Sequence, residues 1–77
     1  MTEKKSLDSL STGDSLVLSH IEPSESRRRM LDLGFLVGER VRCVGVSPMG
    51  DPLMLVVGGK VVALRRRELK SIFGVTP

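Results

Sequence analysis

The sequence is poor in the residues that most often carry catalysis or metal binding. It contains one cysteine, Cys43, and one histidine, His20, and it has no tryptophan or tyrosine. A nucleophile needs an adjacent base and a group that orients it, so a single Cys and a single His argue against an enzyme. Ferrous sites need several converging His or carboxylate ligands, and His20 near Glu22 is the only suggestive pair. We therefore expect no catalytic residues, no metal site and no cofactor.

Aromatic side chains are equally scarce, since Phe35 and Phe73 are the only two. Small barrels that bind single-stranded nucleic acid stack bases on exposed aromatics, and domains that bind proline-rich peptides line a groove with them. Neither surface can be built here. No phosphate-cradling glycine motif that ends in Gly-Lys-Ser/Thr is present, so any GTP chemistry would belong to a partner.

Features of secreted and membrane proteins are also missing. A lone cysteine cannot form an intrachain disulfide, which favours the cytosol for so small a domain. Residues 1–6 lack the apolar core of a signal peptide, and no apolar run approaches the roughly 20 residues of a membrane span. We expect a cytoplasmic protein whose contact with the inner membrane, if any, is made through a partner.

What is present fits one small soluble domain. The chain has 77 residues, of which 40% are hydrophobic and 27% are charged, and its formal net charge is +3. A domain of this size buries only about 60 to 65% of the surface that its unfolded chain exposes, so the core must be modest. We expect a flexible N-terminus over residues 1–6 and a single domain over residues 7–77.

Turn-forming residues divide that domain into short elements. Residues 22–25 (EPSE) combine a proline, a capping hydroxyl and carboxylates, which favours a helix start, and Gly34 can close the helix in the left-handed conformation. Short links between the later apolar segments predict antiparallel hairpins. The predicted elements are strands over residues 15–21, 40–47, 52–57, 60–65 and 71–75, a helix over 24–33 and a helical turn over 65–69.

Two of these strands have unusual patterns. In residues 40–47 the apolar alternation slips around Gly45, which predicts a β-bulge or bend. In residues 52–57 both faces are apolar, so that either both are covered or one meets a partner. About five antiparallel strands with one short inserted α-helix predict a mainly β fold, a small and partly open barrel whose closure protects the sheet edges.

The ordered set of motifs resembles the FeoA family. Residues 33–38 (LGFLVG) after a short helix are followed by residues 48–52 (PMGDP), then by Gly59, and then by Leu64-Arg65 with Glu68 and Ile72. The resemblance covers residues 7–75. It implies an SH3-like barrel that accompanies FeoB, a membrane ferrous-iron transporter with a cytosolic GTPase domain, and acts as an accessory or regulatory protein of ferrous iron uptake. The resemblance also implies the association with transition metal ions that is known for the family.

Two positions depart from the family pattern. Val37 stands where the family usually has proline, which loosens the turn because proline would have pre-set its backbone angle. Leu69 stands where a smaller alanine is frequent. A related SH3-like module also forms the C-terminal domain of metal-dependent repressors, so a free-standing module of that kind is one alternative to the transporter accessory.

The best candidate for partner contact is the apolar loop over residues 35–38, with methionines that can adapt to varied surfaces. Its alternative role is to plug the end of the barrel. Arginine triplets at residues 27–29 and 65–67 suit an acidic protein surface, and a solvated helix face or nucleic acid is the alternative. The predicted partner contacts are Met30, Phe35, Leu36, Val37, Met49, Met54, Arg27, Arg28 and Arg66. The predicted structural turn residues are Gly34, Gly38, Gly50, Asp51, Pro52 and Gly59.

Overall fold

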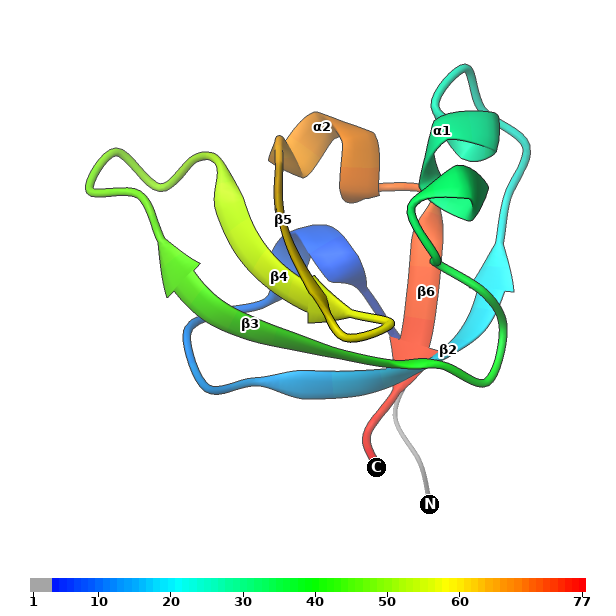
Figure 1. Cartoon of the computed structure of the whole chain (residues 1–77), viewed down its shortest axis with the longest axis horizontal. Coiled ribbons are helices and arrows are strands. Elements are labelled where there is room, and N and C mark those ends of the chain that lie inside the picture. Colours follow the sequence, from blue (N-terminus) through cyan, green and yellow to red (C-terminus); the bar gives the residue numbers. More distant parts are fainter. Residues whose placement is uncertain (1–3) are drawn as a thin grey trace.

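The fold is a six-stranded antiparallel sheet that curls into a partly open barrel (Figure 1). A computed structural model describes residues 4–77. The elements in chain order are β1 (Lys4–Ser6), a 3-10 turn η1 (Leu7–Ser9), β2 (Ser15–Ile21), α1 (Arg27–Asp32), β3 (Arg40–Val46), β4 (Leu53–Val57), β5 (Lys60–Leu64), α2 (Arg66–Leu69) and β6 (Ile72–Val75).

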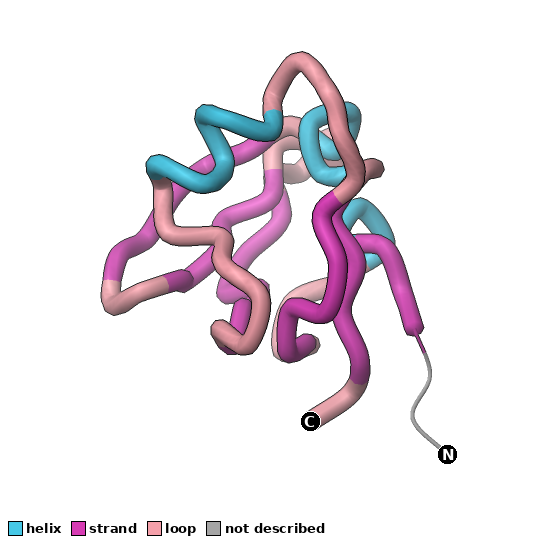
Figure 2. Tube along the Cα trace, turned by 90° about the vertical axis from the view of Figure 1, so that its right-hand side faces the viewer, coloured by secondary structure: helices cyan, strands magenta, loops and turns pink. Residues whose placement is uncertain are grey.

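The strand order is β1-β6-β2-β3-β4-β5, and every neighbouring pair is antiparallel. The predicted hairpins are thus confirmed, and β4 and β5 are joined by Gly58 and Gly59, which both have the positive φ that tight hairpin turns require. Figure 2 shows both helices at one end of the barrel and the C-terminus at the other. No helix among residues 4–77 is long and apolar enough to cross a membrane.

The N-terminal prediction was wrong for residues 4–6. These residues form β1 and pair with β6, with Ser6 opposite Phe73. The Lys4 ammonium lies 5.0 Å from the centroid of the Phe73 ring, a favourable cation–π distance. A three-residue polar strand has no apolar period that sequence could reveal, because backbone pairing holds it in place. Residues 1–3, which belong to the same expectation, lie outside the described residues.

The helix is shorter than predicted. α1 begins at Arg27, not at Ser24, because residues 24–26 form a turn in which the Arg27 N–H bonds the Ser24 carbonyl at 3.3 Å. Ser26 occupies the cap position with no side-chain hydrogen bond to the helix. The proline and the two serines therefore mark the approach to the helix, not its first turn.

Alternating strand residues and the helices fill the barrel. The inward side chains of the strands include Leu16, Leu18, Val41, Cys43, Leu55 and Val57, and the helices and turns add Leu7, Met30 and Leu69. The predicted bulge is confirmed, since the β3–β4 register shifts between Cys43 and Gly45. Gly74 in β6 lies against the neighbouring strand, and a Cβ atom there would stand 2.8 Å from both the Leu16 Cβ and the Val17 carbonyl oxygen.

Candidate docking surface

The loop over residues 35–38, hereafter the docking loop, starts from a well-defined helix end. The Gly34 N–H bonds the Leu31 carbonyl, the Phe35 N–H bonds the Met30 carbonyl, both at 3.0 Å, and Gly34 has a φ of +102°. This is the Schellman pattern, which usually brings together the two side chains in the positions of Met30 and Phe35. Both side chains are fully buried. The prediction that Met30 and Phe35 contact a partner was therefore wrong, because the helix end turns them into the core.

The next two residues of the docking loop point outward. Leu36 is 49% exposed and Val37 is 65% exposed. The Glu39 N–H bonds the Leu36 carbonyl at 3.0 Å, which closes a turn in which Gly38 has a φ of +95°. The Gly38 N–H and the Glu39 carbonyl also bond the backbone of Leu18 in β2, each at 2.8 Å. The backbone thus holds two apolar side chains in solvent on an anchored turn, even without proline at residue 37.

The methionines do not extend this loop into one patch. Met49 is 92% exposed, but it lies in the β3–β4 connection, which projects from the left of Figure 1, whereas the segment that follows α1 lies on the right. Met54 is exposed on the outer face of β4. The expectation that these residues join the docking loop was wrong, because β3 separates them from it. Their exposure keeps each available for a separate contact.

Arg66 does not act as a surface cation. Its side chain donates to the Gly50 carbonyl from Nε at 2.6 Å and to the Asp8 carbonyl from Nη1 at 2.5 Å, while its backbone N–H bonds Asp51 Oδ1 at 2.9 Å. These bonds tie η1 and the β3–β4 connection to α2. We therefore correct the role of Arg66 from partner contact to structural cross-link.

The predicted turn residues have the expected backbone. Gly34, Gly38, Gly50 and Gly59 all have a positive φ, which side chains other than glycine rarely adopt. Asp51 and Pro52 complete the β3–β4 connection, and the peptide bond between them is cis. The six residues predicted to shape turns thus lie in turns or next to them.

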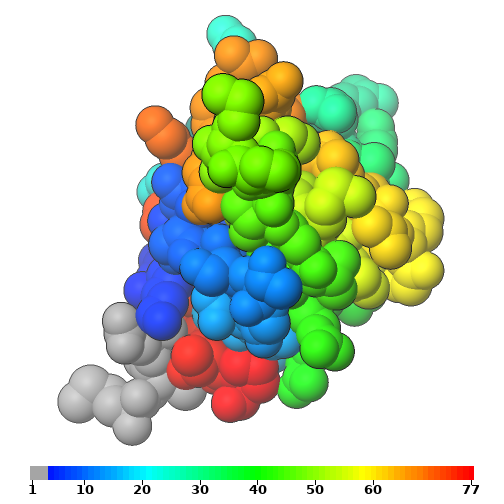
Figure 3. Space-filling model, turned by 90° about the vertical axis from the view of Figure 1, so that its left-hand side faces the viewer, coloured from blue at the N-terminus to red at the C-terminus, as the bar shows by residue number. Residues whose placement is uncertain are grey.

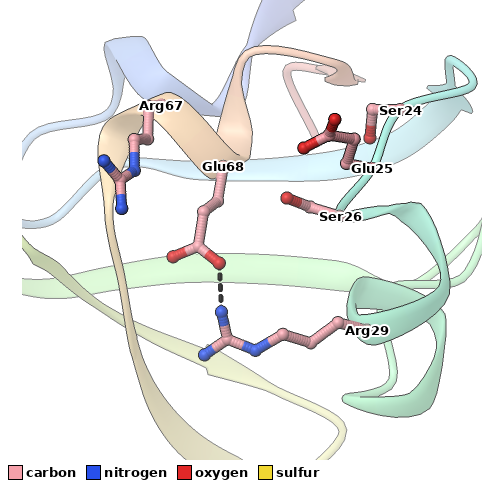
Figure 4. A pocket seen from close by; sticks show the side chains of 6 residues that line it. All are labelled: Ser24, Glu25, Ser26, Arg29, Arg67 and Glu68. Carbon is pink, nitrogen blue, oxygen red and sulfur yellow. Dashed lines mark hydrogen bonds and ion pairs between the residues drawn. The ribbon is translucent and has the colours of Figure 1, made fainter.

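Arg27 and Arg28 are exposed on α1, as partner contacts would need to be. The third arginine of this triplet differs, because Arg29 forms an ion pair with Glu68 on α2 (Figure 4). A polar hollow of about 590 Å³ opens beside this pair, lined by Ser24, Glu25, Ser26, Arg29, Arg67 and Glu68. Its lining contains both carboxylates and guanidinium groups. Glu68 also accepts the Arg65 N–H at 3.2 Å. The hollow therefore lies between α1 and α2, and its lining favours neither cations nor anions.

Cys43 and His20 have ordinary structural surroundings. The Cys43 thiol is fully buried among core side chains, as the alternation predicted, and it donates weakly to the Gly45 carbonyl at 3.4 Å. His20 Nε2 stands 3.8 Å from Glu22 Oε2 on the surface, and its ring stacks on Phe73. No group of three His, Cys, Asp or Glu that could hold a metal ion occurs within residues 4–77. Neither phenylalanine offers an open stacking platform, since Phe35 is buried and Phe73 is covered by His20 and Lys4.

Sequence reasoning missed two exposed apolar residues, Val44 and Val61. Val44 is the residue that the bulge in β3 displaces, and Val61 lies opposite Val56 across the β4–β5 pair. The signal that could have found them is the apolar character of both faces of the neighbouring strand, which indicated a covered or partner-binding face.

The comparisons with known proteins agree with this architecture. The FeoA domain family matches residues 5–75. A fusion protein of Porphyromonas gingivalis, which joins Fe(2+) transport protein A to the Fe(2+) transporter FeoB, is 33% identical over 67 residues, or 86% of this chain. The chain spans only 8% of the length of that relative.

Solved structures give the same result. An FeoA-like protein of Clostridium acetobutylicum is 30% identical, with a TM-score of 0.85 over 97% of this chain and 87% of that one. FeoA of Stenotrophomonas maltophilia in complex with zinc, an SH3 domain protein, is 36% identical, with a TM-score of 0.71 over 94% and 86% of the two chains. The predicted mainly β, SH3-like barrel is confirmed. The chain belongs to the FeoA domain family, a family of small accessory domains linked to ferrous iron transport.

Proposed function

We propose that this chain is a cytoplasmic, non-enzymatic accessory protein of ferrous iron import that docks onto the cytosolic GTPase part of an FeoB-type transporter. The observation that carries the proposal is the fusion relative, in which an FeoA part and FeoB belong to one polypeptide. Joining two domains in one chain holds them at a high effective concentration, which suits parts that work in contact.

The docking loop suits such a contact. Leu36 and Val37 are apolar and exposed, and hydrogen bonds to β2 fix the turn that carries them. A preorganised apolar anchor loses little conformational freedom on binding, so more of its burial energy contributes to affinity. The exposed Arg27 and Arg28 on the preceding helix can steer the domain toward an acidic surface and speed association. Chemistry, GTP hydrolysis included, would remain with the transporter.

A calorimetric titration tests this proposal. The domain is titrated against the purified cytosolic part of the FeoB-type transporter from the same cell, with and without guanine nucleotide. We expect a saturable heat with one domain bound per transporter part. The absence of heat in every nucleotide state, together with no co-elution on a sizing column, would contradict docking and leave the domain without its proposed partner.

A further inference from the structure

A second surface, separate from the docking loop, lies on the outside of the sheet. β4 and β5 alternate between core and solvent, so that Leu53, Leu55 and Val57 point inward and their neighbours point outward. The solvent-facing side chains of an antiparallel sheet are ordinarily polar, whereas the outward side chains of β4 and β5 are apolar. We call this surface the outer β face. Its members are Met54, Val56, Val61 and Ala63, together with Val44, the exposed bulge residue of β3 that adjoins Gly45 opposite Met54.

The strand register brings these side chains together. Met54 lies opposite Ala63, Val56 lies opposite Val61, and Gly45 beside Val44 lies opposite Met54. Side chains opposite each other on one face of an antiparallel pair are near neighbours. Val61 is 60% exposed, Val44 43% and Met54 38%. Figure 3 shows residues of β3, β4 and β5, coloured green to yellow, as adjoining parts of one side of the molecule.

Arginines border the outer β face. Arg42 lies opposite Val56, and Arg40, two residues earlier in β3, shares its face. Arg65 follows Ala63 by two residues at the other end. Asp51 lies beside Arg65, with its Oδ2 3.9 Å from the Arg65 guanidinium and its Oδ1 accepting the Arg66 N–H. The three strands β3, β4 and β5 contain no Asp or Glu, so every charged side chain on them is cationic.

We propose that the outer β face binds a segment of another protein that presents apolar side chains bordered by carboxylates. Apolar side chains in the centre of such a patch supply affinity, and the arginine rim selects acidic partners and rejects basic ones. A second copy of this chain is a poor occupant, because its own outer β face would bring arginines against arginines. A membrane surface is a poor occupant as well, because the face lacks the aromatic anchors of interfacial proteins.

The docking loop and the outer β face are distinct. The docking loop precedes β3, whereas Val44 lies near the far end of that strand, beside β4 and β5. The inference therefore does not depend on the transporter being the partner of the docking loop. Variants on one surface serve as controls for the other.

The test is an NMR titration of the ¹⁵N-labelled domain with a synthetic octapeptide of alternating leucine and glutamate. Control peptides replace every leucine by serine or every glutamate by lysine. We expect the leucine–glutamate peptide alone to shift the amide signals of the outer β face. Val61→Asp and Arg42→Glu should each weaken binding roughly tenfold, and Leu36→Asp in the docking loop should leave it unchanged. Val61→Thr keeps the β-branched shape and should fall between wild type and Val61→Asp.

Each other outcome overturns the proposal. Equal binding of the lysine peptide would show that the arginine rim selects nothing, and shifts elsewhere on the domain would move the site. Dimerisation through these residues, measured by sedimentation, would make a second copy the occupant. Adsorption of the domain to anionic phospholipid vesicles, if Val61→Asp abolishes it, would make a membrane surface the occupant. No shift with any peptide would leave no partner of the proposed chemistry.

Discussion

Replacing Leu36 by aspartate separates the two roles that the docking loop could have. Leu36 is 49% exposed. Because full burial of a leucine side chain is worth about 1.5 to 3 kcal/mol, its exposed half contributes about 1 kcal/mol when a partner covers it. An aspartate in its place also loses hydration in the complex, which raises the total cost to about 2 kcal/mol or more. We expect the affinity for the transporter's cytosolic part to fall about thirtyfold or more.

The same change should leave the domain folded. The half of Leu36 that is already buried contributes about 1 kcal/mol to folding, which lowers the melting temperature by about 4 to 8 °C in a domain of this size. If Leu36 were a barrel plug, an unpaired buried carboxylate would cost far more. Phe35, which is fully buried, fills the core beside it.

The assay combines a thermal melt, a calorimetric titration and ferrous iron uptake by cells that carry the variant. Thr12→Asp serves as the control, because it places the same charge on an exposed turn away from the docking loop. We expect Leu36→Asp to be folded, to bind weakly and to fail in uptake, whereas Thr12→Asp behaves like the wild type. A Leu36→Asp protein that is unfolded, or that is folded and fully active, would refute the reasoning.

Three further predictions concern the core and the metal. Cys43→Ala should lower the free energy of unfolding by about 1 kcal/mol and leave iron uptake intact, since Cys43 is a buried packing residue; rapid thiol labelling of the native protein would contradict this. Anaerobic titration should find no stoichiometric micromolar binding of ferrous iron, given the absence of a ligand cluster within residues 4–77. Gly74→Ala should destabilise the fold by about 1 to 3 kcal/mol because its Cβ would overlap Leu16 and the Val17 backbone. Gly45→Ala is the control, because its Cβ would meet only Met54, at 3.6 Å, and it should change the unfolding free energy by less than about 1 kcal/mol. Equal melting temperatures for the two variants would show that Gly74 is not tightly packed against Leu16 and Val17.

The strands could be predicted because their signals are local. The strand over residues 15–21 matches β2 residue for residue, and the slip of the apolar pattern at Gly45 marks the bulge. Period-two alternation and glycine turns act within a few residues, so one sequence contains enough to place them. The family resemblance supplied the closure of these strands into a barrel.

The fate of individual side chains could not be predicted in the same way. Phe35 looked like a loop residue that faces a partner, but the helix end pairs it with Met30 and buries both. Arg66 looked like part of a charged run, yet its bonds reach Asp8, which is 58 residues away in sequence. Such contacts depend on tertiary structure, and neither composition nor spacing encodes them. The exposure of Leu36 and Val37 was anticipated because a short loop cannot bury three large apolar residues.

The most direct test of the proposed docking is an NMR titration of the ¹⁵N-labelled domain with the cytosolic part of the FeoB-type transporter. The proposal predicts that the amide signals of Leu36, Val37 and Gly38 shift or broaden first, followed by those of Arg27 and Arg28 on α1. Signals of the core should keep their positions. Titration to saturating concentrations with no change at residues 36–38 would contradict the account, whether the transporter part binds elsewhere on the domain or does not bind at all.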